Sequence, residues 1–135
     1  PRRPLRGRAA LGLAALLALA GPARAADLSD LMGRMDKAFA ELVRSLLVVT
    51  AQKNDAVPAL AEAARHAAQI AGTASEVPGA EAFPGDPAFL KLAQEAQGAA
   101  RQAEAAAKEG RLEGAVAALV RLHAACTGCH KEFRF

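Results

Sequence analysis

Two cysteines and a histidine near the C-terminal end of the chain are its clearest candidates for chemistry. Cys126, Cys129 and His130 form the pattern C-x-x-C-H. On a helix, residues three and four positions apart lie on one face. Two thiols placed in this way can add to the two vinyl groups of one porphyrin, while the adjacent imidazole binds its iron. The spacing is therefore typical of covalent c-type haem attachment.

A C-x-x-C pair also occurs in thioredoxin-like redox sites, in structural disulfides and in zinc sites. Redox pairs usually begin a helix that follows a strand, and no strand pattern precedes Cys126. A zinc site would need further ligands, which besides His130 only His66 and His123 could supply. The chain has two cysteines in all, so nothing indicates a disulfide scaffold. Haem attachment is the hypothesis that the pattern favours.

Residues 1–25 have the organisation of a cleavable export signal. Four arginines among residues 1–8 precede an apolar run at residues 9–20, and Ala23-Arg24-Ala25 offers an A-x-A cleavage site. The apolar run has 12 residues, whereas a membrane-spanning helix needs about 20. This length favours a cleaved signal over a retained membrane anchor. We expect a periplasmic protein with one mature domain over residues 26–135, exported by either a Sec or a twin-arginine route.

Removal of this segment changes the sign of the net charge. The segment contains five of the 17 basic residues and none of the 14 acidic ones, so the net charge falls from +3 to −2. The high isoelectric point belongs largely to the signal, and nucleic-acid binding is not expected. The sequence also lacks a nucleophile–base pair or paired carboxylates, so we expect no enzymatic activity.

Apolar residues recur with helical spacing along nearly all of the mature chain, and no segment has the alternation of a strand. Helix signals at Asn54-Asp55, Asp86-Pro87 and Gly110 separate the periodic segments. Two short links and one long loop at residues 72–86 predict an all-α, antiparallel four-helix bundle. His66 is expected at the surface. The four predicted helices cover residues 27–52, a segment after Asp55 that ends near Gly72, residues 87–109 and residues 112–133.

With its helices and its C-terminal motif, the chain resembles the class II cytochromes c, which include the cytochromes c′. The resemblance covers residues 27–135 and rests on three features. These are the Cys126–His130 motif, the run from Cys129 to Arg134, and Phe83-Pro84-Gly85 before the third helix. It implies an exported four-helix bundle with one covalent haem c inside one end.

The resemblance also indicates what lies on the far side of the haem iron. His130 would be one axial ligand, and the position matched by Met32 is the distal one. A thioether is a known haem ligand, so we expect Met32 as the sixth ligand, with Met35 as the reserve candidate. Core packing is the other role open to both methionines. The chain departs from the cytochromes c′ at Leu28, where they usually carry an arginine. Further candidate haem contacts are Phe39, His123 and Arg134, with His123 expected to be partly buried.

The leading functional hypothesis is a monohaem electron carrier that works with redox partner proteins. The alternative is a five-coordinate, cytochrome c′-like protein that binds NO or CO, with Met32 as a distal residue that blocks the site without binding iron. A third hypothesis is a haem-bearing sensor or interaction module. Monomer and homodimer are both compatible with the sequence, and no membrane association is expected after signal cleavage.

Overall fold

The computed structural model describes residues 26–51 and 56–133 of the 135-residue chain. These residues form four α-helices and no strand, which confirms the predicted all-α class. The helices are α1 (Leu28–Ala51), α2 (Ala56–Glu76), α3 (Pro87–Lys108) and α4 (Leu112–Glu132), with a short 3-10 helix η1 (Val77–Gly79) after α2. None of the described helices is both long and apolar enough to cross a membrane.

Helices α3 and α4 are delimited by local signals at the positions where the sequence predicts them. The Asp86 carboxylate accepts hydrogen bonds from the backbone N–H groups of Ala88 and Phe89, each at 2.9 Å, and caps the start of α3. Gly110 ends α3 with a φ of +72°, a value that favours glycine. The N–H of Arg111 donates to the carbonyl of Ala106 at 2.8 Å, and Gly110 N–H donates to Ala107, the Schellman arrangement.

Helix α2 is longer than the sequence predicts. It continues past Gly72 to Glu76, so the expected loop at residues 72–86 is largely helical in its first half. Ile70, Ala74 and Val77 are all buried and extend the apolar face beyond the glycine. Their burial outweighs the roughly 1 kcal/mol that an interior glycine costs. Pro78 follows and disfavours further α-helix at the residue before it.

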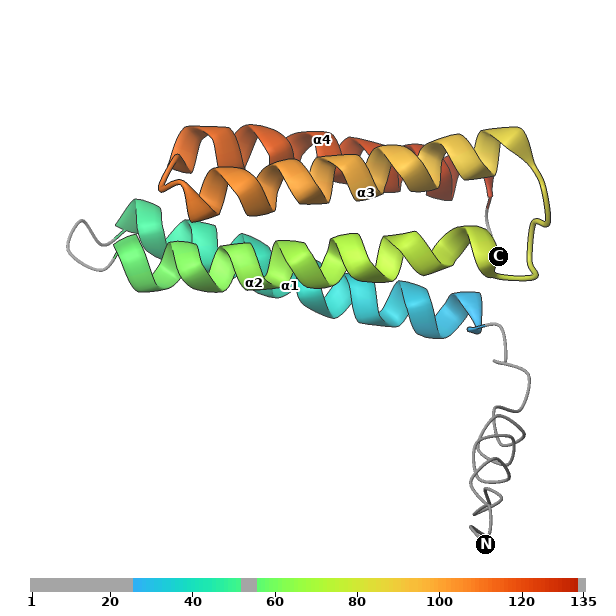
Figure 1. Ribbon diagram of the computed structural model, residues 1–135, viewed down its shortest axis with the longest axis horizontal. Coiled ribbons are helices and arrows are strands. Elements are labelled where there is room, and N and C mark those ends of the chain that lie inside the picture. The colour runs from blue at the N-terminus through green and yellow to red at the C-terminus, as the bar shows by residue number, and fades with distance from the viewer. Residues whose placement is uncertain (1–25, 52–55, 134–135) are drawn as a thin grey trace, which may run out of the picture.

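Each helix packs mainly on its neighbour in the chain: α1 on α2, α2 on α3 and α3 on α4. Figure 1 shows α1 and α2 on one side of the molecule and α3 and α4 on the other. The start of α1 and the end of α4 lie at the same end of the molecule, beside the connection between α2 and α3. Helices α1 and α4 contact each other much less than the consecutive helices do.

Alanine dominates the interior where the helices are close-packed. A Cβ atom placed on Gly114 of α4 would lie 2.7 Å from Nη1 of Arg111 and 3.2 Å from Cβ of Ala106 in α3. Helix α4 therefore approaches α3 closely at this glycine. At the end that holds the α2–α3 connection, an aromatic cluster formed by Phe83, Phe89 and Phe133 takes over. Their ring centroids are 4.9–5.3 Å apart, within the range that favours aromatic pairs. Phe133, just after α4, is thereby tied to the α2–α3 connection.

Candidate functional site

A cavity of about 300 Å³ lies where α1 and α4 are separated, near the end of the molecule that carries the aromatic cluster. All four helices and η1 contribute to its walls. Most of the lining side chains are apolar or sulfur-containing, and the exposed residues Asp36, His123 and His130 mark its opening to solvent. Its size lies at the lower end of the range for small-molecule sites, and its apolar walls are typical of them.

The wall formed by α4 carries the whole C-x-x-C-H motif. Cys126, Cys129 and His130 all line the cavity, as expected for residues three and four positions apart on one helix. Both cysteines are half-buried free thiols. The Phe133 N–H donates to the Cys129 carbonyl at 2.8 Å, so the helical hydrogen bonding continues through the motif.

The thiols have the electrostatics of unactivated cysteines. Burial raises the pKa of Cys126, and the neighbouring Cys129 raises it further. Burial also raises the pKa of Cys129, with an added contribution from the Glu132 charge. Thioredoxin-like redox cysteines have lowered pKa values and sit near a helix N-terminus. Cys126 and Cys129 instead lie in the last turns of α4, so this site has neither feature of such a redox pair.

A zinc site at the motif has no support in the part of the chain that the structure describes. No group of three or more His, Cys, Asp or Glu side chains there could hold a metal ion. The sequence analysis named His66 as a possible further zinc ligand and expected it at the surface. His66 lies on α2 and does not line this cavity. Its expected exposure is also wrong: His66 is only 7% exposed, because it packs in a cleft between α1 and α2.

The wall formed by α1 brings both methionines to the cavity. Met32, Met35 and Phe39 are half-buried and line it, whereas Leu31, Leu42 and Leu46 on the adjacent face are fully packed in the interior. The structure therefore collects two thioethers, two thiols and the imidazole of His130 around one space. These are the ligand types that haem proteins use for covalent attachment and axial coordination.

His123 also lines the cavity, but it is exposed rather than partly buried as expected. It lies at the opening of the cavity to solvent, which accounts for the exposure. Its ring faces that of Phe39 across the α1–α4 seam, with centroids 6.0 Å apart. The Thr127 hydroxyl donates to the His123 carbonyl at 2.8 Å. Arg134, the remaining candidate contact, lies outside the described residues, as do the predicted signal and the Asn54-Asp55 cap.

Several cavity residues were not identified from the sequence. Ile70, Ala74 and Val77 form the wall contributed by α2 and η1, and Asp36 lies at the opening. Spacing of three and four residues links Ile70, Ala74 and Val77, so a longer α2 would have predicted their common face. Asp36 carries no sequence signal beyond its position one turn after Met32.

The residues present fit a haem. The cavity supplies apolar walls, two thiols at the attachment spacing and imidazole and thioether donors from opposite helices. No buried side-chain nitrogen or oxygen among the described residues lacks a hydrogen-bond partner, so no orphaned polar atom at the site calls for another ligand. Leu28, at the position where the cytochromes c′ carry an arginine, is buried beside Leu31 in the same end of the molecule.

No protein-family model, curated protein or solved structure matches the chain. The resemblance to class II cytochromes c therefore rests on sequence features alone: the Cys126–His130 motif, the run from Cys129 to Arg134, Phe83-Pro84-Gly85 and the helical pattern.

Proposed function

We propose that this chain is an exported monohaem c-type cytochrome of class II that carries single electrons in the periplasm. In this proposal the four helices form an antiparallel bundle with the haem near one end. Cys126 and Cys129 hold the haem covalently, and His130 and Met32 bind its iron. One observation carries the proposal: a single cavity is lined by both thiols, the following histidine and both methionines of the chain.

The haem iron, when bound, supplies reversible one-electron redox chemistry. The chain's residues would position the group and control access to it. Cys126 and Cys129 fix its location on α4, and the attachment turn orients His130. Met32 would approach it from α1, which forms another wall of the same cavity. Ile70, Val77 and Leu92 keep water away from the interior side, since all three line the cavity and two are buried.

A His/Met ligand pair suits electron transfer because it raises the reduction potential of haem iron. The opening between α1 and α4, marked by exposed Asp36 and His123, would leave one edge of the group near the surface. A redox partner could then approach that edge without rearrangement of the helices.

Absorption spectroscopy of the purified protein tests the proposal. Denaturation in alkaline pyridine should give the spectrum of haem c, and the haem should stay with the polypeptide on a denaturing gel. The reduced protein should have a low-spin spectrum that changes little when CO is added, because Met32 occupies the sixth position.

The gas-binding alternative gives a different result in the same experiment. If the reduced protein has a high-spin spectrum and CO rapidly converts it to that of a CO complex, the function is NO or CO binding rather than electron transfer. Met32 then blocks the distal site without binding iron. The absence of covalent haem from protein produced with a haem-attachment system would overturn both functions.

A further inference from the structure

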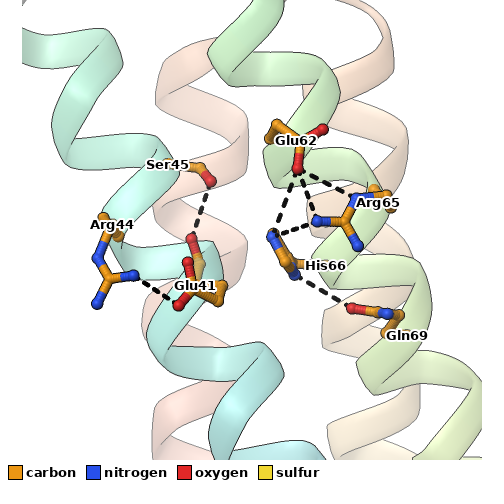
Figure 2. Close-up of polar contacts among 7 residues, drawn as sticks. All are labelled: Glu41, Arg44, Ser45, Glu62, Arg65, His66 and Gln69. Atoms are coloured by element: carbon orange, nitrogen blue, oxygen red, sulfur yellow. Dashed lines mark hydrogen bonds and ion pairs between the residues drawn. The ribbon is translucent and has the colours of Figure 1, made fainter.

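A second cleft, on the opposite flank of α1 from the haem-site cavity, contains a buried histidine that the proposed function does not use. The cleft has a volume of about 500 Å³ and lies between α1 and α2. His66 of α2 lines it and is 7% exposed. Charged residues of both helices line this cleft. Figure 2 shows two separate sets of polar contacts, one within α1 around Glu41 and one within α2 around His66.

The geometry assigns one tautomer to His66. Nη2 of Arg65 lies 2.9 Å from Nε2 of His66. A guanidinium can only donate hydrogen bonds, so Nε2 must be the acceptor and carry no hydrogen. The hydrogen is therefore on Nδ1, which lies 3.1 Å from Oε1 of Gln69 and donates to it. This arrangement satisfies both ring nitrogens of the neutral imidazole.

Arg65 serves two acceptors at once. Its Nη2 and Nε lie 2.7 and 3.1 Å from Oε2 of Glu62, and the hydrogen bond from Arg65 lowers the pKa of Glu62. The same Glu62 oxygen is 3.7 Å from Nε2 of His66. Arg65 thus contacts both the Glu62 carboxylate and the His66 imidazole, which are one helical turn apart (Figure 2).

A proton on Nε2 of His66 is incompatible with this arrangement. The protonated nitrogen becomes a donor, and it then faces a second donor that carries the same charge. The Glu62 carboxylate, 3.7 Å from Nε2, is an acceptor for this proton. A small side-chain rotation of Glu62 would bring its oxygen within hydrogen-bond distance of the imidazolium.

Helix α1 offers Arg65 a second partner. Glu41 of α1 lines the same cleft, and its charge contributes to the raised pKa of Arg65, after the larger effect of the Glu62 hydrogen bond. Glu41 now pairs with Arg44 at 2.6 Å, an exposed contact within α1. The other charged groups of the cleft are Lys37, and Arg34 with Glu76, which form an ion pair at 3.1 Å.

We propose that protonation of His66 operates an exchange of ion pairs across the α1–α2 interface. The proton enters from solvent at Nε2, Glu62 turns from Arg65 to the imidazolium, and Arg65 swings toward Glu41 of α1. The Nε2–H bond of the imidazolium is the one covalent bond that forms, and none breaks in the protein. The neutral state has an Arg65–Glu62 pair within α2, and the protonated state has a His66–Glu62 pair within α2 and an Arg65–Glu41 pair between the helices.

Proton NMR of the imidazole of His66 in the full chain, between about pH 5 and 8 where histidines titrate, tests the exchange. Replacing the carboxylate by Glu62→Gln should lower the titration midpoint of His66, because the imidazolium loses its acceptor. Arg65→Gln should raise it, because the competing cation is gone. Each change is expected to be about half a pH unit, as for weak exposed pairs. Lys91→Gln, which removes an exposed pair with Glu95 on α3, is the control and should leave the midpoint unchanged.

A second measurement follows Arg65 itself. Its Nε resonance should move with the same midpoint as His66 in the native chain, and Glu41→Gln should reduce the size of that movement. An Arg65 signal that does not follow His66 would overturn the exchange. The exchange would also be overturned if Glu62→Gln and Arg65→Gln moved the titration midpoint of His66 equally and in the same direction. The haem proposal is unaffected by either result, since none of these residues lines the haem-site cavity.

Discussion

Phe39 of α1 and His123 of α4 face each other at the cavity that carries Cys126, Cys129 and His130, with ring centroids 6.0 Å apart and ring planes at 33°. Helices α1 and α4 contact each other much less than consecutive helices do. The ring pair is one of the contacts that join these two helices. Contacts between aromatic rings contribute about 0.5–1.5 kcal/mol beyond the area that they bury.

Replacing Phe39 by alanine should weaken this junction. Because Phe39 is half-buried, we expect the free energy of unfolding to fall by about 1–3 kcal/mol. A fully buried phenylalanine typically costs about 3–5 kcal/mol when it is replaced by alanine. Urea unfolding monitored by circular dichroism measures it. His123→Ala removes the other ring and serves as the comparison. If the two single losses add fully in the double variant, the rings do not interact.

Phe89→Ala should lower the free energy of unfolding more than Phe39→Ala does, by about 3–5 kcal/mol. Phe89 is fully buried and contacts both Phe83 and Phe133, so its loss leaves a cavity at the end of the molecule. The same unfolding experiment applies. Phe89→Leu, which retains much of the volume, should recover a large part of the loss, and equal destabilisation by both variants would contradict the packing role.

The two methionines can be separated by spectroscopy of the holoprotein. Met32→Ala should convert the low-spin iron to high-spin and permit rapid CO binding, since the proposed sixth ligand is lost. Met35→Ala is the matched control, one turn along the same wall, and should stay low-spin. If Met35→Ala becomes high-spin and Met32→Ala stays low-spin, Met35 rather than Met32 is the sixth ligand.

The cysteines should contribute separately to attachment. Cys126→Ala or Cys129→Ala should leave a haem held by one thioether, with a pyridine haemochrome band displaced to longer wavelength because one vinyl group stays unsaturated. The double variant should lose haem from the polypeptide on a denaturing gel. Retention of covalent haem without both thiols would exclude this attachment site.

The Glu62–Arg65 pair predicts a pH dependence of stability. The Arg65 hydrogen bond lowers the pKa of Glu62 in the folded chain. The pair therefore stabilises the fold fully above the ordinary glutamate pKa of about 4.3, and this contribution disappears as the pH falls through the lowered folded value. The difference in unfolding free energy between the native chain and Glu62→Gln should shrink on acidification. A difference that grows below pH 4 would contradict this sign.

Features determined by neighbouring residues in the chain could be predicted from the sequence. The Asp86 cap and the Gly110 stop depend on a few adjacent backbone groups, and both lie where the sequence placed them. The grouping of Cys126, Cys129 and His130 on one wall follows from helical spacing alone. Met32 and Met35 line the same cavity as the motif, while their role as iron ligands stays a prediction from the family resemblance.

Features determined by contacts between helices could not be predicted in this way. The polar residues near His66 suggested a surface position, but α1 covers it through a side-by-side contact that the local sequence does not encode. The extension of α2 past Gly72 depends on the burial of Ala74 and Val77 against other elements. His123 is more exposed than expected because α1 and α4 diverge beside it.

The order of helix contacts has a consequence for how the chain folds. Among the described residues, every extensive helix–helix contact joins helices that are consecutive in the chain, and the contact between α1 and α4 is slight. Such topologies have low contact order and fold rapidly, in microseconds to milliseconds. The polypeptide can therefore assemble from successive helix pairs, and the last and entropically most costly closure, between its first and last helices, falls at the cavity itself.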